Sequence, residues 1–571
     1  MMGAISDKLM RIINTKEDIR QALISKGYDV PTSIPFKEYA KMISDLPCRV
    51  DSFPDIEGIV ARYSALGLTN EQMAANPVWV DKTDNGHDLQ MKNLAWKEGS
   101  GISDIYPGAL VFDGVDDYGV CENFPILTKE KGYTVVALRR WITRGERALG
   151  LVSNVKNWLN NGAFLLEYRN IQADHLNKPI SFRAIGSEMD LPHILNYQTS
   201  KSCNGVSITT GNFEGTDVLH VGKLAPTNVG TCINAAIWEL VFLDHDATEE
   251  ELTKIKDYFV KTYPWLFPDQ AWTVTGKTNE DEDRATIANI TGNGNDLVLS
   301  NFGFAEGSGY GLYKTPFELY PSVQHSSKYS LSFSKFALGD HNLIIAPKQN
   351  DLSYDIKVKV TGLKDGVKFK WGWIGTTGYI DITTDGIHML NKPASQIRQL
   401  LVEFAEDFDP DHVVTIEQIP EYEGYLITDG VDDKIVSSVF GMGKDFTIVG
   451  EWKFIDNKKS GTGLVKGSSF YIYNTMIGLD LYINSGSVKN SLDGIKSINA
   501  ACSDGRAYDR NWNEILANTG NVVGSGGILE VSSSGGRFDR IAFKNLAIYP
   551  RILSKDDCIK AYNYLQTLKS K

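Results

Sequence analysis

Short apolar or alternating runs, separated by Gly, Asn and Asp, follow one another along most of the chain. The segments YTVVALRRW from 133 and FTIVGEWKF from 446 are typical. Between 354 and 360, Tyr, Ile and Val alternate with Asp and Lys, which predicts a strand with one buried and one solvated face. Short strands joined by turns favour antiparallel sandwiches over βαβ units.

Residues 1–48 have a helical period instead. Thr15 followed by Asp18, Gly27 as a stop signal and Pro35 as a first-turn residue predict three short helices. Such helices bury too little area to be stable alone, so we expect this region to attach to a partner or to self-associate. The apolar residues assigned to this attachment are Leu9, Ile12, Ile13, Ile19, Leu23, Phe36, Tyr39, Met42 and Ile43.

An internal repeat is the most informative feature of the sequence. Each copy ends with a strand followed by a helix, AIWELVFLDHDATEEELTKIKDYF from 236 and AFKNLAIYPRILSKDDCIKAYNYL from 542. Thr248 with Glu251, and Ser554 with Asp557, predict the capped starts of these helices. The other matching segments are GLTNE (67–71) with GKTNE (276–280), DNGHDLQMKNLAWKEGSG (84–101) with GNGNDLVLSNFGFAEGSG (292–309), and LVFDGVDD (110–117) with LITDGVDD (426–433).

The spacing of the matching segments differs between the copies. Asp88 corresponds to Asp296, whereas Asp113 corresponds to Asp429, so the second copy contains 108 additional residues between these points. That is the size of a small domain, and surface loops tolerate such insertions. We therefore predict a mainly β chain with four parts: a helical attachment or oligomerisation module (1–48), a first sandwich (49–268), a second, split sandwich (269–315 and 421–571) and a small inserted β-sandwich (316–420).

Composition and charge narrow the function classes. The chain has 571 residues and a formal net charge of -13, which argues against a general nucleic-acid or anionic-membrane binder. Residues 1–48 carry +1, so the acidity belongs to the β part. No apolar run approaches the ~20 residues of a spanning helix, and the first segment has no apolar signal core. The 6 cysteines show no CxxC and no paired spacing, so we expect free, buried thiols.

The repeated DGVDD sequence is the one candidate metal motif. It groups Asp113, Asp116 and Asp117 in the first copy and Asp429, Asp432 and Asp433 in the second. Clustered carboxylates bind hard cations, but Asp-Gly also forms tight turns, and the alternating ligands and closing Glu of an EF-hand are missing. The turn is the favoured interpretation, and no metal or other cofactor is expected.

No motif supports catalysis. GKT at 276–278 resembles the end of a phosphate-binding loop, but Ala271 stands where the first glycine is required. The histidines have no metal-ligand spacing, and no GxSxG lies in a triad context. The acidic clusters at 249–251, 281–283 and 407–411 lie in predicted helix starts or loops, which indicates solvated charge rather than the paired carboxylates of a glycosidase. We expect no catalytic residues.

Five aromatic residues are candidates for ligand binding. Trp158 and Trp512 lie in Asn-rich loops, while Trp371 and Trp373 share one face of a predicted strand and Tyr379 follows the next turn. An aromatic ring packs well against the C–H face of a pyranose, and loops on a rigid scaffold commonly carry binding residues. Most of the remaining tryptophans are expected in the core.

Two parts of the sequence resemble a known family. TKEDIRQALISKGYDVPTSIPFKEYAKMISDL resembles the helical module that opens many tailed-phage fibre and virion proteins. The GLTNE, NGHDLQMKNLAW and LVFDGVDDY series resembles concanavalin A-like (laminin G-like) jelly-roll domains of virion proteins from crAss-like and other Bacteroides phages. The resemblance covers the N-terminal module and both repeats but not 316–420, which we expect to be immunoglobulin-like or another small sandwich.

The resemblance implies a structural role on a virion. The expected protein is a head or tail fibre or decoration subunit, attached through its N-terminal helices and presenting lectin-like domains for host attachment. Its implied partners are capsid or tail proteins, further copies of itself, with a trimer as the common fibre arrangement, and host-surface polysaccharide. Nucleic-acid binding and membrane insertion are not expected, and the location is the virion, assembled in the cytoplasm of the host bacterium. The family implies no catalytic residue set.

Two alternatives stay open at this point. One is a glycan-degrading enzyme of the depolymerase or sialidase type with accessory lectin domains. The other is a bacterial surface glycan-binding protein, against which the absent signal sequence argues.

Overall fold

The computed structural model describes Lys16, Ile19, Arg20 and Pro35, and then most of the chain from Phe53 to Ser570. The residues after Phe53 that lie outside this description are 129, 144–148, 155–164, 169–194, 205, 208–215, 224–231, 306, 312–324, 328–329, 335–353, 364–366, 374–379, 393–397, 405–408, 410, 442, 456–461, 467–469, 475–477, 484–490, 494–497, 517–525, 532, 535–536, 539 and 571. The chain forms two compact units, Met1–Ile56 with Glu249–Thr262, and Glu57–Thr248 with Tyr263–Lys571.

In the first unit, the best described element is helix α4 (Glu249–Thr262). It begins directly after Thr248, as predicted, and three glutamates occupy its first turn, where a carboxylate is stabilised by the helix dipole. The ring of Phe53 meets that of Tyr258 at 4.9 Å in an edge-to-face contact. Ile19 is helical and half-buried, whereas the other eight predicted attachment residues lie outside the described residues. The helical attachment module therefore stays a prediction.

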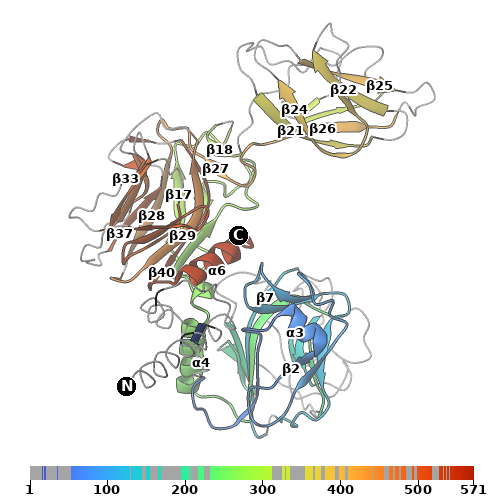
Figure 1. The fold of residues 1–571 in the computed structure, drawn as a ribbon, viewed down its shortest axis with the longest axis vertical. Helices are drawn as coiled ribbons and strands as arrows, with labels where there is room; N and C mark the ends of the chain where they lie inside the picture. The colour runs from blue at the N-terminus through green and yellow to red at the C-terminus, as the bar shows by residue number, and fades with distance from the viewer. Residues whose placement is uncertain are drawn as a thin grey trace, which may run out of the picture. The chain divides into compact units, whose positions relative to one another are not determined.

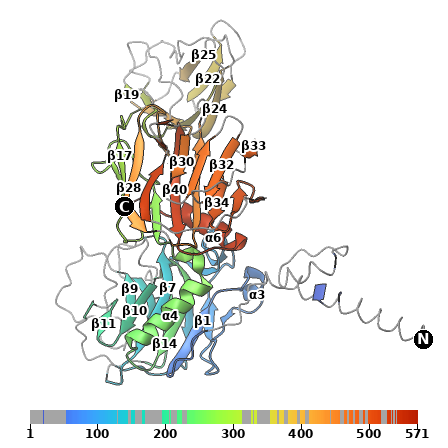
Figure 2. The same cartoon turned by 90° about the vertical axis from the view of Figure 1, so that its left-hand side faces the viewer.

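The first sheet of the first repeat holds most of its long strands. Its order is β12-β11-β10-β7-β14-β5-β4, and β1 pairs with β14 outside that path. All of its pairings are antiparallel. The strands are β1 (Ile59–Ser64), β4 (Gly101–Ser103), β5 (Ala109–Asp113), β7 (Thr134–Trp141), β10 (Leu195–Thr199), β11 (Ser202–Cys203), β12 (Val206–Ser207) and β14 (Asn234–Leu243). Figure 2 shows β7, β10 and β14 side by side.

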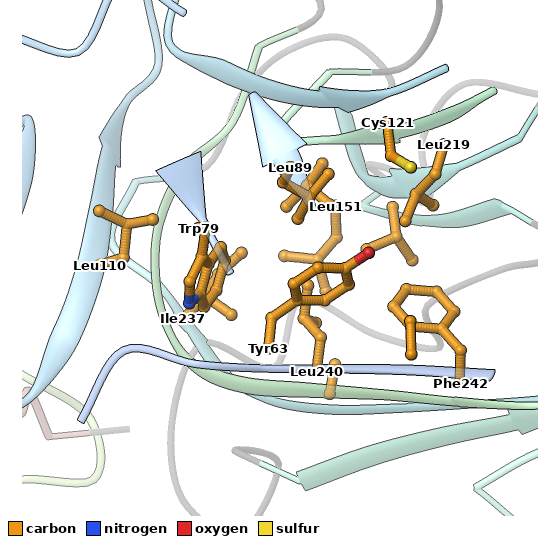
Figure 3. Packing of buried hydrophobic residues seen from close by; sticks show 14 of the residues in the cluster. Tyr63, Trp79, Leu89, Leu110, Cys121, Leu151, Leu219, Ile237, Leu240 and Phe242 are labelled. Carbon is orange, nitrogen blue, oxygen red and sulfur yellow. The ribbon is translucent and has the colours of Figure 1, made fainter. Parts of the chain in front are cut away.

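A second sheet packs against the first over a common core. Its order is β2-β3-β6-β13-β8-β9. Figure 3 shows how Trp79, Leu89 and Leu151 of this sheet meet Tyr63 and Phe242 of the other, all of them fully buried. Two facing sheets with a shared apolar interior are a β-sandwich. The strands are β2 (Val78–Trp79), β3 (Leu89–Lys92), β6 (Tyr118–Cys121), β8 (Leu149–Ser153), β9 (Leu165–Tyr168) and β13 (Leu219–Val221).

The second repeat has the same strand order in its corresponding sheet, β36-β35-β34-β29-β40-β27-β18, with β15 beside β40. The register also agrees, since both central pairs contain one irregularity, between Ile237 and Glu239 in β14 and between Glu451 and Trp452 in β29. The strands are β15 (Gln270–Thr273), β18 (Gly309–Tyr310), β27 (Leu426–Ile427), β29 (Thr447–Phe454), β34 (Ile498–Cys502), β35 (Arg506–Asp509), β36 (Glu514–Leu516) and β40 (Ile541–Tyr549) (Figure 1).

The partner sheet of the second repeat runs β16-β17-β28-β37-β30-β31-β32-β33. Trp272 and Trp452 of the first sheet and Leu297 and Leu529 of the second belong to one buried cluster. The strands are β16 (Thr286–Ile287), β17 (Leu297–Ser300), β28 (Lys434–Gly441), β30 (Thr462–Lys466), β31 (Phe470–Asn474), β32 (Gly478–Ile483), β33 (Ser491–Asp493) and β37 (Gly526–Val531), with a small extra pair, β38 (Ser533–Ser534) and β39 (Arg537–Phe538).

The additional residues of the second repeat are inserted between two strands, β18 and β27, that are neighbours in one sheet. β18 and β27 are hydrogen-bonded to each other, although more than a hundred residues separate them. Between them lie two sheets, β19-β20-β26-β21-β24 and β23-β22-β25. Ile356, Val358 and Val360 are buried and alternate with exposed residues, as predicted. The strands are β19 (His325–Ser327), β20 (Ser330–Phe333), β21 (Tyr354–Thr361), β22 (Val367–Trp373), β23 (Ile380–Ile382), β24 (Gly386–Lys392), β25 (Arg398–Phe404) and β26 (Val414–Ile419).

The described part of the second unit contains three further helical elements. They are α3 (Asn70–Ala75), the 3-10 turn η1 (Pro264–Leu266) and α6 (Lys555–Gln566). The predicted cap of α6 is present, because the Ser554 side chain accepts a hydrogen bond from the Asp557 backbone N–H. The chain is mainly β with several antiparallel sheets, whereas the concanavalin A-like jelly-roll assignment and the domain boundaries stay predictions.

Candidate functional site

The DGVDD loop of the first repeat is a closed turn. The Asp113 backbone N–H donates to Asp117 Oδ2 at 3.0 Å, and the Val115 N–H donates to Asp113 Oδ1 at 2.7 Å. Asn93 lies outside the loop and donates from Nδ2 to the Asp116 carbonyl at 3.0 Å. Asp117 is fully buried and Asp116 is exposed. The carboxylates of Asp113 and Asp117 therefore close the loop, and the backbone carbonyl of Asp116 links it to the preceding repeat motif.

The second repeat reproduces these contacts. Asp429 N–H donates to Asp433 Oδ2 at 2.7 Å, and Asn301 Nδ2 donates to the Asp432 carbonyl at 3.0 Å. Ser308 of the EGSG motif donates to Asp433 Oδ1 at 3.0 Å. In each copy the DGVDD loop is thus hydrogen-bonded to the preceding repeat motifs. We call the loop together with these hydrogen-bonding partners the DGVDD latch.

Both latches contain a carboxyl group that is difficult to ionise. Burial raises the pKa of Asp117 to about 6, and the charges of Asp113 and Asp116 act in the same direction. Burial raises the pKa of Asp433 to about 6 in the same way. In each copy one carboxylate oxygen from all three aspartates lies within 4.8 Å of the others, so these groups could hold a cation. Their hydrogen bonds are those of a turn, which agrees with the favoured interpretation from the sequence.

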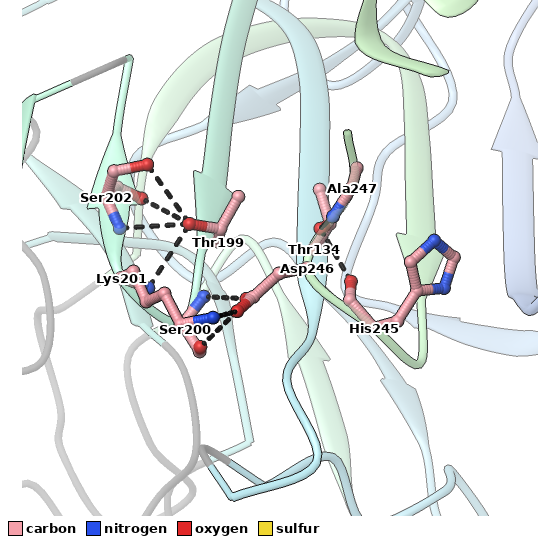
Figure 4. Close-up of polar contacts among 8 residues, drawn as sticks. All are labelled: Thr134, Thr199, Ser200, Lys201, Ser202, His245, Asp246 and Ala247. Atoms are coloured by element: carbon pink, nitrogen blue, oxygen red, sulfur yellow. Dashed lines mark hydrogen bonds and ion pairs between the residues drawn. The ribbon is translucent and has the colours of Figure 1, made fainter. Parts of the chain in front are cut away.

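Other polar clusters also have structural partners. In Figure 4, Asp246 accepts from the Ser200 N–H at 2.8 Å and from the Ser200 hydroxyl at 2.9 Å, and forms an ion pair with Lys201. Thr134 Oγ1 donates to the His245 carbonyl. Lys277, in the GKT sequence, is buried, and its Nζ forms an ion pair with Asp283 at 2.6 Å.

Trp512 is the candidate aromatic residue that the structure places on a turn. It lies between β35 and β36 with a φ of 61°, and it is half-buried. Asp509 shapes this turn, because its Oδ1 accepts from the backbone N–H groups of Asn511 and Asn513 at 2.8 and 2.7 Å. The Trp512 ring meets the Tyr562 ring of α6 edge-to-face at 5.6 Å. In the corresponding β11–β12 hairpin, Asn204 occupies the left-handed region.

Of the other predicted aromatic residues, the structure describes the backbone of two. Trp371 and Trp373 lie in β22, opposite Leu400 and Arg398 of β25. Trp158 and Tyr379 lie outside the described residues.

The sequence interpretation missed a group of residues beside Trp512. Tyr562 lies next to its ring, and the described residues nearby include Tyr422, Glu451 and Lys453. A residue-by-residue comparison of the two repeats could have found Glu451, because the first copy has the apolar Leu138 at the corresponding position. Their proximity to Trp512 depends on strand order, which no local pattern reveals.

The buried side chains include four of the cysteines. Cys121, Cys232, Cys502 and Cys558 are free and buried, as expected, whereas Cys48 lies outside the described residues. Within the part of the chain that the structure describes, no helix is long and apolar enough to cross a membrane.

Comparisons with known proteins give no family for this chain. No family model matches it, and no curated protein matches it. Among solved structures, it is similar to the extracellular region of zebrafish Gpr126 (10% identity, 40% of this chain and 37% of that chain, TM-score 0.20). It is similar to Trypanosoma rangeli sialidase (11% identity, 66% and 48%, TM-score 0.20) and to a botulinum neurotoxin serotype D/C binding domain (8% identity, 86% and 99%, TM-score 0.25). The chain spans less than half the length of the first two, and TM-scores this low carry no argument about its function.

Proposed function

We propose that the chain is a virion structural protein of a tailed phage, a head or tail fibre or decoration subunit, whose β-sandwiches bind glycans of the host surface. The family resemblance of the sequence supports the virion role. One structural observation carries the glycan role, namely the half-buried Trp512 at a loop position with a φ of 61°, beside Tyr562. A bulky side chain rarely adopts positive φ, and such a conformation costs about 1–3 kcal/mol. Two other aromatic residues with positive φ, Trp96 and Phe304, pack against the sandwich cores, whereas the Trp512 ring lies against Tyr562 of α6. A binding role accounts for an aromatic ring at this turn outside the core clusters.

The glycan role is tested with Trp512→Gly in the full chain. Glycine adopts a φ of 61° without strain, so this substitution removes the ring and leaves the turn intact. We expect the variant to lose at least about tenfold in affinity for glycans extracted from host cells. Trp512→Phe, which keeps an aromatic face, serves as the matched control and retains most of the binding. Wild-type affinity in Trp512→Gly, or no glycan binding by the unmodified chain, would contradict the proposal.

The attachment role belongs to residues 1–48. We expect a chain without these residues to be missing from purified particles while its β part still shows a cooperative unfolding transition. Immunoblotting of particles grown with either version measures incorporation. A truncated chain that still decorates particles would overturn this part of the proposal.

We further propose that the protein acts by binding and not by catalysis. Incubation of the purified chain with host capsule should release no reducing ends above a buffer control. Release that continues in Trp512→Gly would instead favour a glycan-degrading enzyme with its active centre elsewhere.

A further inference from the structure

A cluster of charged and aromatic side chains adjoins Trp512 on the second sandwich. Glu451 and Lys453 lie on the face of β29 opposite the core, because they alternate with Trp452 and Phe454, which belong to the core cluster. Lys544 comes from the neighbouring strand β40. These residues meet on the sheet face although the chain separates them by about ninety residues.

Glu451 lies at the centre of this cluster. Its Oε1 accepts a hydrogen bond from the Tyr425 hydroxyl, and its Oε2 lies 3.4 Å from Lys544 Nζ. Lys453 Nζ lies 3.9 Å from Glu451 Oε1 and 4.6 Å from the centre of the Tyr425 ring. Burial raises the pKa of Tyr562, and the charge of Glu451 and a hydrogen bond to it raise this pKa further, so the ring of Tyr562 connects the cluster to Trp512.

The cluster carries more positive than negative charge. Glu451 is surrounded by Lys453 and Lys544, and the exposed Arg510 acts electrostatically on Lys453. Burial lowers the pKa of Lys453, and the cations of Arg510 and Lys544 lower it further against the attraction of Glu451. This is a local cationic surface on a chain whose formal net charge is -13. An added anion would relieve the repulsion among the three cations.

The first repeat has different residues at the same positions. The strand register pairs Leu138 with Glu239 and Glu451 with Asn545, so Leu138 corresponds to Glu451. By the same register, Arg140 corresponds to Lys453 and Trp238 to Lys544. Leu138 and Trp238 are fully buried, whereas the side chains of their counterparts Glu451 and Lys544 are 17% and 23% exposed. At these two positions the second copy thus keeps partly desolvated charges where the same fold accepts apolar side chains, while a cation stands at the third position in both copies. Desolvating charges costs free energy, which points to a role other than stability.

We propose that Lys453, Lys544 and Arg510, together with the rings of Tyr422, Tyr562 and Trp512, bind an acidic sugar residue, namely a pyranose that carries a carboxylate. The ammonium and guanidinium groups supply charge-assisted hydrogen bonds to the carboxylate. The rings supply apolar surface for the C–H face of the pyranose. The ring of Tyr422 lies 5.9 Å from Lys453 Nζ, so cation and aromatic surface are adjacent within the site. This inference rests on the proposed glycan binding and specifies the chemical class of the glycan.

The test uses pairs of polymers that differ in charge. Polygalacturonate and polysialic acid carry a carboxylate on every sugar, and their methyl esters have the same backbones without the charge. With the full chain immobilised, biolayer interferometry should show at least one acid polymer binding about tenfold or more tightly than its ester. Dextran sulfate against dextran forms a separate arm, and stronger binding of sulfate than of any carboxylate would overturn the assignment of the carboxylate.

Matched variants locate the interaction. We expect Lys453→Gln/Arg510→Gln to lose about tenfold or more in affinity for the acid polymer, because it removes two cations of the site. Lys357→Gln/Lys359→Gln, two exposed lysines of β21, removes the same charge elsewhere and should change the affinity less than about twofold. Arg510→Gln alone, at an exposed position, serves where the double variant fails to fold, and should weaken binding in the same direction.

The outcomes separate this inference from the function on which it rests. Equal binding of acid and ester, with loss in Trp512→Gly, contradicts the acidic-sugar assignment and leaves glycan binding in place. Equal loss in the Lys357/Lys359 control contradicts the assignment to this cluster. Binding of neither polymers nor host glycans contradicts both proposals.

Discussion

The two repeats share a sheet face that they complete in different ways. In the first, Arg140 is nearly buried, with Cζ 5.7 Å from the Tyr106 ring and 5.2 Å from the Tyr564 ring, and its Nη2 donates to the Thr567 carbonyl at 2.7 Å. In the second, the corresponding Lys453 lies beside Tyr422 and remains 30% exposed. The turns that carry the two tyrosines are the same, because Ala109 N–H bonds to Tyr106 O and Tyr425 N–H bonds to Tyr422 O.

Comparing the two copies separates the features that both sandwiches share from those that differ between them. A cation beside a tyrosine recurs in both copies, and the DGVDD latch recurs with its hydrogen bonds. Trp238, in contrast, is fully buried against the Tyr564 ring at 6.0 Å, whereas its counterpart Lys544 forms an ion pair with Glu451. The recurring features belong to the sandwich, and the differing ones lie in the cluster that we propose as a ligand site.

Exchanging Trp238 and Lys544, which lie at the irregularity in the strand register of each copy, should change the unfolding free energy most. Trp238→Lys should destabilise the protein by about 3–5 kcal/mol, because it leaves a cavity and a charge in a fully buried site. The reciprocal Lys544→Trp, at a partly exposed position, should cost less than about 1 kcal/mol. Urea unfolding followed by circular dichroism measures both. If both substitutions lowered the unfolding free energy by the same amount, the buried site of Trp238 and the partly exposed site of Lys544 would not differ as we infer.

The DGVDD latches should respond alike, because their contacts are alike. The folded-state pKa of about 6 for Asp117 and Asp433 lies above the ordinary 3.8, so the stability contributed by each group is present below about pH 4 and is lost as pH rises through about 6. Asp117→Asn and Asp433→Asn should therefore each raise the unfolding free energy at pH 7.5 by about 1–3 kcal/mol and have little effect at pH 4. Thermal melts at both pH values measure this.

A further variant of the DGVDD loop tests the turn interpretation against a cation site. Under the turn interpretation, Ca²⁺ leaves the melting temperature of the unmodified chain unchanged. Because Asp116 is exposed, Asp116→Asn also leaves the melting temperature unchanged. A rise in melting temperature with Ca²⁺ that Asp116→Asn abolishes would contradict it, since a bound ion stabilises the folded state.

Glu451→Gln should have a smaller effect on stability. Burial opposes ionisation of Glu451, but Tyr425, Lys544 and Lys453 together hold its pKa below the ordinary 4.5. Its contribution is therefore present above about pH 4.5 and is lost as pH falls through the folded-state pKa. We expect the variant to lose about 1–2 kcal/mol at pH 7 and to lose part of the acid sensitivity of the unmodified chain. Denaturant titrations between pH 7 and pH 3 measure the unfolding free energy. If its pH dependence were the same in Glu451→Gln as in the unmodified chain, ionisation of Glu451 would not contribute to stability.

Arg510→Gln should have the smallest effect on stability, within about 0.5 kcal/mol, because the side chain is exposed. Because Arg510→Gln should weaken binding to acid polymers without changing stability, this variant distinguishes an effect on ligand recognition from an effect on folding. A destabilisation above about 1 kcal/mol would instead assign Arg510 to the packing of the sandwich.

The sequence predicts the strands and the repeat well, because both depend on local patterns. The alternation through Ile356 and Val360, the strand before α6 and the Ser554 cap are all present. The turn at DGVDD follows from the conformational preferences of Asp and Gly. These features need no knowledge of which strands are neighbours.

The cluster around Glu451 could not be predicted in the same way. Glu451 and Lys544 meet because β29 and β40 pair in antiparallel register, and Tyr562 reaches Trp512 because α6 folds back towards the β35–β36 turn. Trp512 itself was identified from its polar neighbours, but its contact with the Tyr562 ring is visible in the structure alone. A helical or strand period carries no information about such contacts.

If the face of the second sandwich around Glu451 and Trp512 binds a polysaccharide, the bound chain shields the aromatic side chains there from oxidation. Hydroxyl-radical footprinting of the full chain, with and without an acid polysaccharide, tests this binding directly by measuring oxidation of single aromatic side chains. We predict protection of Trp512, Tyr422 and Tyr562, and unchanged oxidation of Trp96, a half-buried tryptophan of the first repeat that also has positive φ. Equal oxidation of Trp512 with and without a bound polysaccharide would contradict ligand binding at this face.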